Sequence, residues 1–213
     1  MTTLLLIRHG ESAANGKGCF AGQLDIPLSE RGHEQAMRTA NYIAKTYHVD
    51  KIYSSDLSRA YDTAQPIAKA FGLEIQTDKE LREIHSGDWQ GLSFDELQEK
   101  YADGYGVWLK DIGNAVCPNG ETVKELFERI WTTVKKIADE NDGKTVVITT
   151  HATPIRAMVC RLQGLAVEDM KNVPWVSNAS ISVVTVENNA WKLCEVSIDG
   201  YLSGLQTRFP ANV

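Results

Sequence analysis

The sequence predicts an α/β fold, arranged as a three-layer α/β/α sandwich around a mixed but mostly parallel sheet. Short apolar runs at residues 3–8, 51–54 and 144–150 have the length and composition of buried strands. Stretches with helical spacing of apolar residues follow these runs, and such alternation of strands and helices favours parallel pairing. The chain of 213 residues has the length of one ordinary domain with a substantial core.

The N-terminal part alternates strands and helices. Residues 3–8 form the first predicted strand, and residues 29–47 form a helix whose apolar positions recur at helical spacing. The strand at 51–54 precedes a helix that we expect Asp56 or Ser58 to cap and Gly72 to end. Residues 74–77 and 81–84 are predicted to be short extended pieces.

The second half contains an excursion and then returns to the sheet. Residues 85–119, rich in glycine and aromatic residues, predict a small lid-like insertion in a single domain spanning 1–213. Capping-box patterns at 93–96 and 122–125 predict a brief helix and then a long one to about residue 140. After the strand at 144–150, Thr153 and Pro154 indicate a helix start and Gly164 its end. Segments 179–186 and 191–197 predict a terminal hairpin that adds antiparallel strands.

The composition excludes several classes of protein. A net charge of -6 argues against a nucleic-acid or membrane-surface partner, which normally needs a basic face. The four cysteines form no CxxC pair, so a disulfide scaffold and a zinc ribbon are both disfavoured. The apolar start at residues 4–7 is too short for a signal-peptide core, and we therefore expect a reduced, cytoplasmic protein.

Basic residues stand at or just after the ends of the three predicted strands. Arg8 and His9 end the first strand, Arg59 follows the second, and His151 follows the third. Since parallel strands end at one edge of a sheet, these four side chains are expected to surround one small anion. A phosphoryl group matches this set best, because arginine donates paired hydrogen bonds to phosphate and stays charged.

A histidine in this setting can also act as a nucleophile on phosphorus, giving a covalent phosphohistidine. Spacing alone does not decide between the two histidines, although Gly10 lets a phosphate approach closely and so favours His9. A leaving alkoxide needs a proton, and Glu83 is the candidate acid. Three other carboxylates, Glu11, Glu80 and Asp88, are chemically able substitutes.

Four segments resemble the motifs of the histidine phosphatase superfamily, also called phosphoglycerate-mutase-like. Residues 6–12 (LIRHGES), with Asn15 shortly after, resemble its signature. Residues 52–60 resemble the segment with the second arginine, residues 81–91 the acid-base segment, and residues 147–154 the segment with the second histidine. The four motifs occur in the family's order.

The resemblance implies a role for each matching residue and a three-layer α/β/α fold. His9 is the phosphorylated nucleophile, Glu83 is proton donor and acceptor, and the phosphate pocket is formed by Arg8, Arg59 and His151. The substrate-binding set is Arg8, Asn15, Ala21, Gly22, Arg59, His151 and Ala152. The resemblance implies neither a metal nor an organic cofactor.

We therefore expect a histidine acid-type phosphatase that hydrolyses a small phosphorylated metabolite. A cofactor-dependent phosphoglycerate mutase is the alternative; residues 85–119 are a short insertion for a mutase, and the resulting open site admits water. A non-catalytic phospholigand-binding protein is a further alternative. The family's usual residues are replaced at Ala14, Ala21 and Tyr201, which leaves phosphoserine, an α-ribazole phosphate, a sugar phosphate or a broad range of esters open as substrate. A homodimer is also an open expectation.

Overall fold

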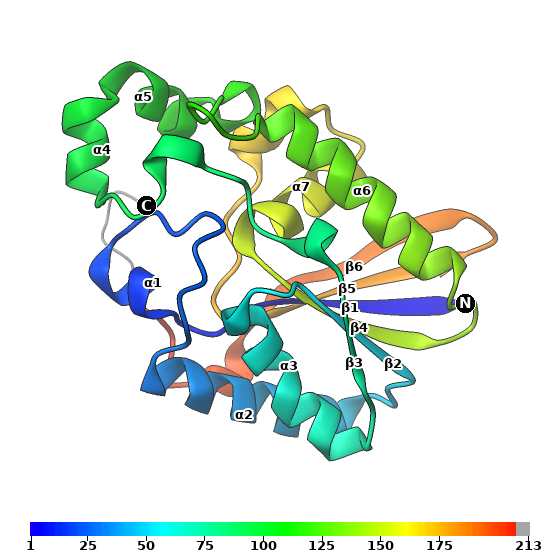
Figure 1. Cartoon of the computed structure of the whole chain (residues 1–213). Coiled ribbons are helices and arrows are strands. Elements are labelled where there is room, and N and C mark those ends of the chain that lie inside the picture. Colours follow the sequence, from blue (N-terminus) through cyan, green and yellow to red (C-terminus); the bar gives the residue numbers. More distant parts are fainter. Residues whose placement is uncertain (208–213) are drawn as a thin grey trace.

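The computed structural model describes residues 1–207 and contains one six-stranded sheet with helices on both faces (Figure 1). The strands are β1 (Thr2–Arg8), β2 (Lys51–Ser54), β3 (Ile75–Thr77), β4 (Thr145–Thr150), β5 (Ile181–Glu187) and β6 (Ala190–Ile198). Their order in the sheet is β3-β2-β4-β1-β5-β6. The first four strands along this order are parallel, whereas β5 runs antiparallel to β1 and to β6. The predicted fold class is confirmed.

Two apolar layers hold the sandwich together. Helices α2 (Glu30–Thr46) and α3 (Ser58–Phe71) cover one face, and α6 (Val123–Asp139) and α7 (Ala152–Leu162) cover the other (Figure 1). Successive residues of β1 point to opposite faces: Leu5 and Ile7 belong to the core under α2 and α3, and Leu4 and Leu6 to the core under α6 and α7. Because both faces of β1 are buried, the sequence there is a continuous apolar run.

Most of the predicted helix starts are confirmed. Ser29 caps α2, Thr122 caps α6 through a capping box, and Ser93 does the same for α4 (Phe94–Lys100). The prediction that Asp56 or Ser58 caps α3 is wrong, since Leu57 is the capping position and makes no side-chain bond. The amide of Ser58 donates instead to the distant Asp25 carboxylate, and the Asp56 carboxylate is occupied by Arg82.

Two predicted boundaries also differ. Residues 81–84 are not a strand: Leu81 ends the short 3₁₀ helix η1 (Lys79–Leu81), and its carbonyl accepts from the Thr150 hydroxyl at 2.6 Å. Helix α7 begins at Ala152, earlier than predicted, with Pro154 inside its first turn. Proline is accommodated there because first-turn amides have no partner within the helix.

The segment 85–119 lies beyond the carboxyl ends of the parallel strands, beside the short helix α1 (Ala13–Lys17) (Figure 1). It contains η2 (Gly87–Trp89), α4, α5 (Ala102–Lys110) and η3 (Ile112–Asn114). Its buried aromatic residues Trp89, Tyr105 and Trp108 belong to the same core cluster as residues of α6 and β4. Its description as an insertion in a single domain stays a prediction, and residues 208–213 of that predicted domain lie outside the described residues.

The predicted terminal hairpin is confirmed. Asn188 and Asn189 connect β5 to β6 with φ values of 50° and 62°, the backbone of a two-residue turn that matches the twist of the strands. The remaining short helices are η4 (Val167–Asn172) and η5 (Gly200–Leu202). Of the helices described, none is long and apolar enough to cross a membrane.

Candidate active site

The predicted phosphate-binding side chains converge at the carboxyl edge of the sheet. Arg8 is the last residue of β1 and His9 follows it, Arg59 lies in the first turn of α3, and His151 stands between β4 and α7. All four are buried. They adjoin a cavity of about 140 Å³ whose lining includes Arg8, His9, Asn15, Ala21, Gly22, Arg59, Glu83 and Ala152. Of the predicted residues only His151 does not line it, lying behind His9 with the ring centroids 5.1 Å apart.

The imidazole of His9 is held in one tautomer. Its Nδ1 lies 2.6 Å from the carbonyl oxygen of Gly10, and a carbonyl only accepts, so Nδ1 carries the proton. The lone pair is therefore on Nε2. Burial, and then the charges of Arg59 and Arg8, hold the pKa of His9 well below its usual value. A neutral imidazole with a free lone pair is the nucleophilic form.

His151 is a second neutral imidazole beside the first. Its Nε2 lies 2.9 Å from the hydroxyl oxygen of Ser55, whereas its buried Nδ1 has no hydrogen-bond partner within residues 1–207. Burial is the main cause that lowers the pKa of His151, followed by the charge of Arg59. An unsatisfied buried ring nitrogen costs free energy in the folded protein.

The two arginines are fixed by backbone carbonyls. Arg8 donates from Nη1 to Val176 at 2.6 Å, and Arg59 donates from Nη1 to Leu24 and from Nη2 to Gly22, both at 2.7 Å. Each guanidinium has five N–H groups, so these bonds orient the side chain without exhausting its donors. Burial lowers the pKa of each to about 10, against the opposing effect of Glu83, and both remain cationic at neutral pH.

The carboxylate of Glu83 lines the same cavity, beside the first turn of α7. Its Oε1 accepts from the amide of Ile84 at 2.9 Å, and its Oε2 accepts from the amide of Thr153 at 3.4 Å. Both oxygens are therefore oriented by backbone donors. The position places an acid-base group on the lining of the same cavity as the two arginines.

Asn15 is oriented by its own helix cap and by a residue far away in the sequence. Its Oδ1 accepts from the amide and hydroxyl of Ser12 and from Nδ2 of Asn178 at 3.3 Å. The Nδ2 group is then what the Asn15 side chain can offer to a ligand. Asn178 is buried and also donates to the carbonyl of His9 at 3.0 Å, so it connects α1 to the backbone of His9.

A family model described as histidine phosphatase superfamily (branch 1) matches residues 4–199 of this chain. The chain belongs to the histidine phosphatase superfamily. Among relatives, "Phosphoserine phosphatase 1" of Hydrogenobacter thermophilus is 34% identical over 202 residues, which cover 95% of each chain. "Phosphoglycerate mutase-like protein 4" of Arabidopsis thaliana is 33% identical, over 89% of this chain and 82% of the relative.

Solved structures of the superfamily share the fold. YhfR of Bacillus stearothermophilus is 27% identical with a TM-score of 0.87, covering 92% of this chain and 96% of its own. A mycobacterial glucosyl-3-phosphoglycerate phosphatase in complex with VO3 is 30% identical with a TM-score of 0.84, covering 92% and 98%.

Several residues of this site are not among those predicted from the sequence. Ser55 was not singled out, although it directly follows β2 and so stands at the same edge as Arg8. Asn178 precedes β5, and because β5 is antiparallel to β1 its amino end lies at that edge. An antiparallel strand therefore contributes to this edge the residues that precede it in the sequence. The predicted hairpin already contains this signal. Trp175 also lines the cavity, and His85 instead borders an exposed groove with Glu121.

The donor set of the site is that of an anion pocket. Residues 1–207 contain no group of three or more His, Cys, Asp or Glu side chains that could hold a metal ion. The cavity brings together two guanidinium groups, one imidazole with a lone pair and one carboxylate. Such a set can bind a tetrahedral oxyanion, attack its central atom and move one proton.

Proposed function

We propose that this chain is a phosphomonoester hydrolase that acts on a small phosphorylated metabolite through a phosphohistidine. The observation that carries the proposal is the neutral His9, whose Nε2 lone pair lies in a pocket with Arg8 and Arg59. Phosphoryl transfer consists mainly of positioning and charge stabilisation, which two buried guanidinium groups supply.

In the first step, His9 Nε2 attacks phosphorus, and the bond from phosphorus to the ester oxygen breaks. Glu83 gives a proton to the departing oxygen, which leaves as an alcohol. Arg8 and Arg59 stabilise the charge on the non-bridging oxygens, and Asn15 adds a donor from α1. His151 lies behind His9 and does not line the cavity, so its contact with the transferred group stays a prediction.

In the second step, water attacks the phosphorus of the phosphohistidine. Glu83, now ionised, takes a proton from this water as the bond from phosphorus to His9 breaks. Inorganic phosphate is released and the neutral imidazole returns. Glu83 thus donates a proton in the first step and accepts one in the second.

Hydrolysis is favoured over the mutase reaction. Relatives named as phosphoserine phosphatases and as a glucosyl-3-phosphoglycerate phosphatase support a small phosphorylated substrate. Within this proposal the chain is a histidine acid-type phosphatase. Its location in the cytoplasm and its assembly as a homodimer stay predictions.

The test is a panel of phosphate monoesters, with 3-phosphoglycerate assayed alongside in the presence and absence of its bisphosphate, all in a strong chelator. We expect ester hydrolysis in the chelator and a phosphoenzyme that survives alkali and is lost in acid. The variant His9→Ala should lose both turnover and labelling but still bind phosphate, while His33→Ala, an exposed histidine on α2, serves as control. Unchanged turnover in His9→Ala, or mutase activity without ester hydrolysis, would contradict the proposal.

A further inference from the structure

Four aromatic side chains form part of the cavity lining, which we call the aromatic wall. We define this wall as Phe20, Phe94, Trp108 and Trp175, all of which line the cavity. The rings of Phe20 and Trp108 meet edge to face with centroids 4.9 Å apart, and Trp108 and Trp175 lie 6.3 Å apart. The wall joins the segment 85–119 to loops that precede α2 and β5.

The aromatic wall is held rigidly. The fully buried Trp89 contacts Phe20 at 5.7 Å and Trp108 at 6.1 Å between centroids. On the other side, the guanidinium of Arg156 lies 4.3 Å from the ring centre of Trp175. Arg156 is in turn fixed by the carbonyl of Val173. A preformed apolar surface of this kind binds apolar groups without a cost of rearrangement.

The charges on the cavity lining are all committed to the phosphoryl chemistry. Among the described lining residues, the cations are Arg8 and Arg59 and the anion is Glu83. Among these described residues no further charged side chain is left to pair with the carboxylate and ammonium of a substrate such as phosphoserine. A charge removed from water without a partner is costly.

We propose that the preferred substrates are phosphomonoesters of apolar, ring-bearing alcohols, whose leaving group packs on the aromatic wall. This substrate class rests on the proposed phosphatase function. The phosphoryl group and the adjoining atoms of the leaving group would occupy the cavity of about 140 Å³. Trp175, which is 37% exposed, offers a stacking surface for the part that reaches solvent.

The experiment compares 2-phenylethyl phosphate with O-phosphoserine, because both have an alkyl alcohol as leaving group. We expect kcat/KM to favour the phenylethyl ester by roughly tenfold or more, and Trp175→Ala to reduce this preference by about tenfold. The control variant is Trp191→Ala, a tryptophan that packs against Trp131 and does not line the cavity. A preference for phosphoserine, or an equal loss on both esters in Trp175→Ala, would overturn the substrate class and leave the phosphatase function standing.

Binding measurements separate this outcome from a failure of the phosphatase function itself. The stable analogue 3-phenylpropylphosphonate should bind more tightly than 2-amino-4-phosphonobutyrate, the corresponding phosphonate of phosphoserine, whether or not any ester is turned over. The reverse order would overturn the substrate class. Absence of turnover for every ester, with the expected order of binding, would overturn only the phosphatase function.

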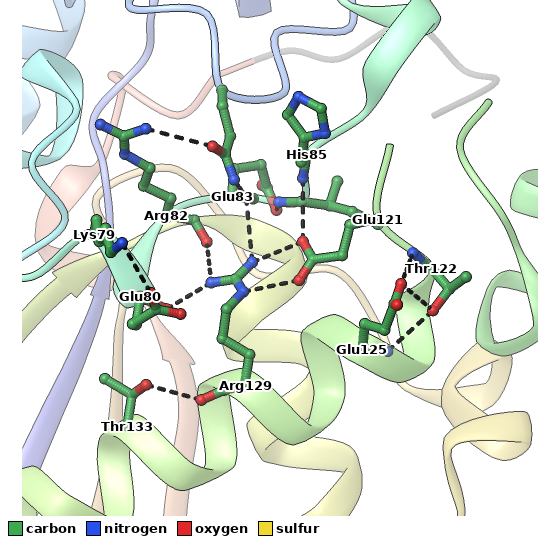
Figure 2. A network of polar contacts seen from close by, with 12 residues as sticks. Lys79, Glu80, Arg82, Glu83, His85, Glu121, Thr122, Glu125, Arg129 and Thr133 are labelled. Atoms are coloured by element: carbon green, nitrogen blue, oxygen red, sulfur yellow. Dashed lines mark hydrogen bonds and ion pairs between the residues drawn. The ribbon is translucent and has the colours of Figure 1, made fainter. Parts of the chain in front are cut away.

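A second, independent observation concerns the segment that carries Glu83. Residues 82–85 belong to no strand, so the carbonyls there have no sheet partner. Figure 2 shows that Arg129, from α6, reaches backbone carbonyls of this segment and of the preceding η1 instead. Its Nη1 donates to Glu80 at 2.5 Å and to Arg82 at 3.1 Å, and its Nη2 approaches the Glu83 carbonyl at 3.5 Å.

Glu121 holds this guanidinium from the other side. Its two carboxylate oxygens each accept from Arg129 at 2.8 Å, in the paired geometry of a strong ion pair. Glu121 also accepts from the amide of His85 at 3.2 Å, and its own amide donates to the His85 carbonyl at 2.7 Å. Both partners are largely buried, with 17% and 13% of their side chains exposed. The ion pair therefore makes hydrogen bonds to the backbone on both sides of Glu83 (Figure 2).

The geometry points to Arg129 and Glu121 as positioning residues, which hold Glu83 where it can pass a proton to the leaving group. This role rests on Glu83 as the proton donor. Neither residue lines the cavity, so neither touches the substrate. Misplacing a catalytic group by a small distance is enough to lose much of its contribution.

The test uses leaving groups that need a proton to different degrees. In Arg129→Ala, kcat/KM for 2-phenylethyl phosphate should fall about 100-fold, and for 4-nitrophenyl phosphate less than about tenfold, since general acid catalysis matters least for good leaving groups. Arg129→Lys should show a smaller fall in kcat/KM than Arg129→Ala. Guanidinium added to the assay should restore part of the activity of Arg129→Ala. The control is Arg38→Gln, a half-buried arginine of α2 that pairs with Glu34 and does not line the cavity.

The double variant Arg129→Ala/Glu83→Gln decides between positioning and general destabilisation. If Arg129 acts through Glu83, the double variant should be no slower than Glu83→Gln on the phenylethyl ester. Equal losses on both esters in Arg129→Ala, or additive losses in the double variant, would overturn the positioning role. Should Arg129→Ala fail to fold, Glu121→Gln provides the same comparison with the cation retained.

Discussion

Acid should destabilise this protein through the two buried imidazoles of the site. His9 and His151 have pKa values held well below 6.5 by burial and by nearby arginines, so both stay neutral in the folded state as the pH falls. In the unfolded chain an imidazole takes up a proton below about pH 6.5. Below that pH the unfolded state therefore binds more protons, and the free energy of unfolding must decrease.

The size of this effect follows from linkage. Each neutral native imidazole lowers the free energy of unfolding by about 1.4 kcal/mol per pH unit once the pH is well below 6.5. Between about pH 8 and about pH 5 the two together account for up to about 4 kcal/mol. This is a large part of the stability of an ordinary domain.

The assay is urea unfolding followed by tryptophan fluorescence, in buffers without phosphate, which would bind the site. His9→Asn should remove roughly half of the pH dependence, or about 2 kcal/mol over the same range. His33→Asn, an exposed histidine on α2, controls for loss of an imidazole. A free energy of unfolding that stays constant from about pH 8 to about pH 5, or an unaltered slope in His9→Asn, would refute the reasoning.

Further predictions concern individual contacts. Arg59→Lys should lower kcat/KM by about 10²–10³, because one point charge cannot reproduce the oriented donors. Wild-type rates in this variant would show that the paired donors of Arg59 are not needed. Ser55→Ala leaves Nε2 of His151 unsatisfied and should cost about 1–3 kcal/mol in urea unfolding, whereas wild-type stability would show that the bond is dispensable. Gly32→Ala places a Cβ 2.0 Å from the backbone oxygen of Glu11, so a loss of about 1–3 kcal/mol and of activity is expected; a fully stable, active variant would contradict this close approach.

The sequence predicted the sheet and the phosphate pocket because both depend on local patterns. The apolar run of β1 and the basic residues that end it are adjacent in the chain, and parallel pairing brings such ends together. The predicted strand at 144–150 places His151 at the same edge of the sheet. The family motifs then assigned a residue to each role.

Contacts between side chains and distant backbone could not be predicted in this way. Residues 81–84 have the composition of a strand, but Arg129 and Thr150 occupy carbonyls that a sheet neighbour would need. The cap of α3 was misplaced for a similar reason, since Asp25 comes from a loop 33 residues earlier. A local sequence pattern contains no information about such a distant partner.

The bond between Nδ1 of His9 and the Gly10 carbonyl has a chemical consequence for the intermediate. Histidine can be phosphorylated on either ring nitrogen, and the two isomers differ in stability and are distinguishable by antibodies and by phosphorus resonance. Because one nitrogen is committed to the carbonyl, the ring cannot turn over to present it without breaking that bond. The protein should therefore yield a single regioisomer, with the phosphoryl group on the nitrogen remote from the main chain.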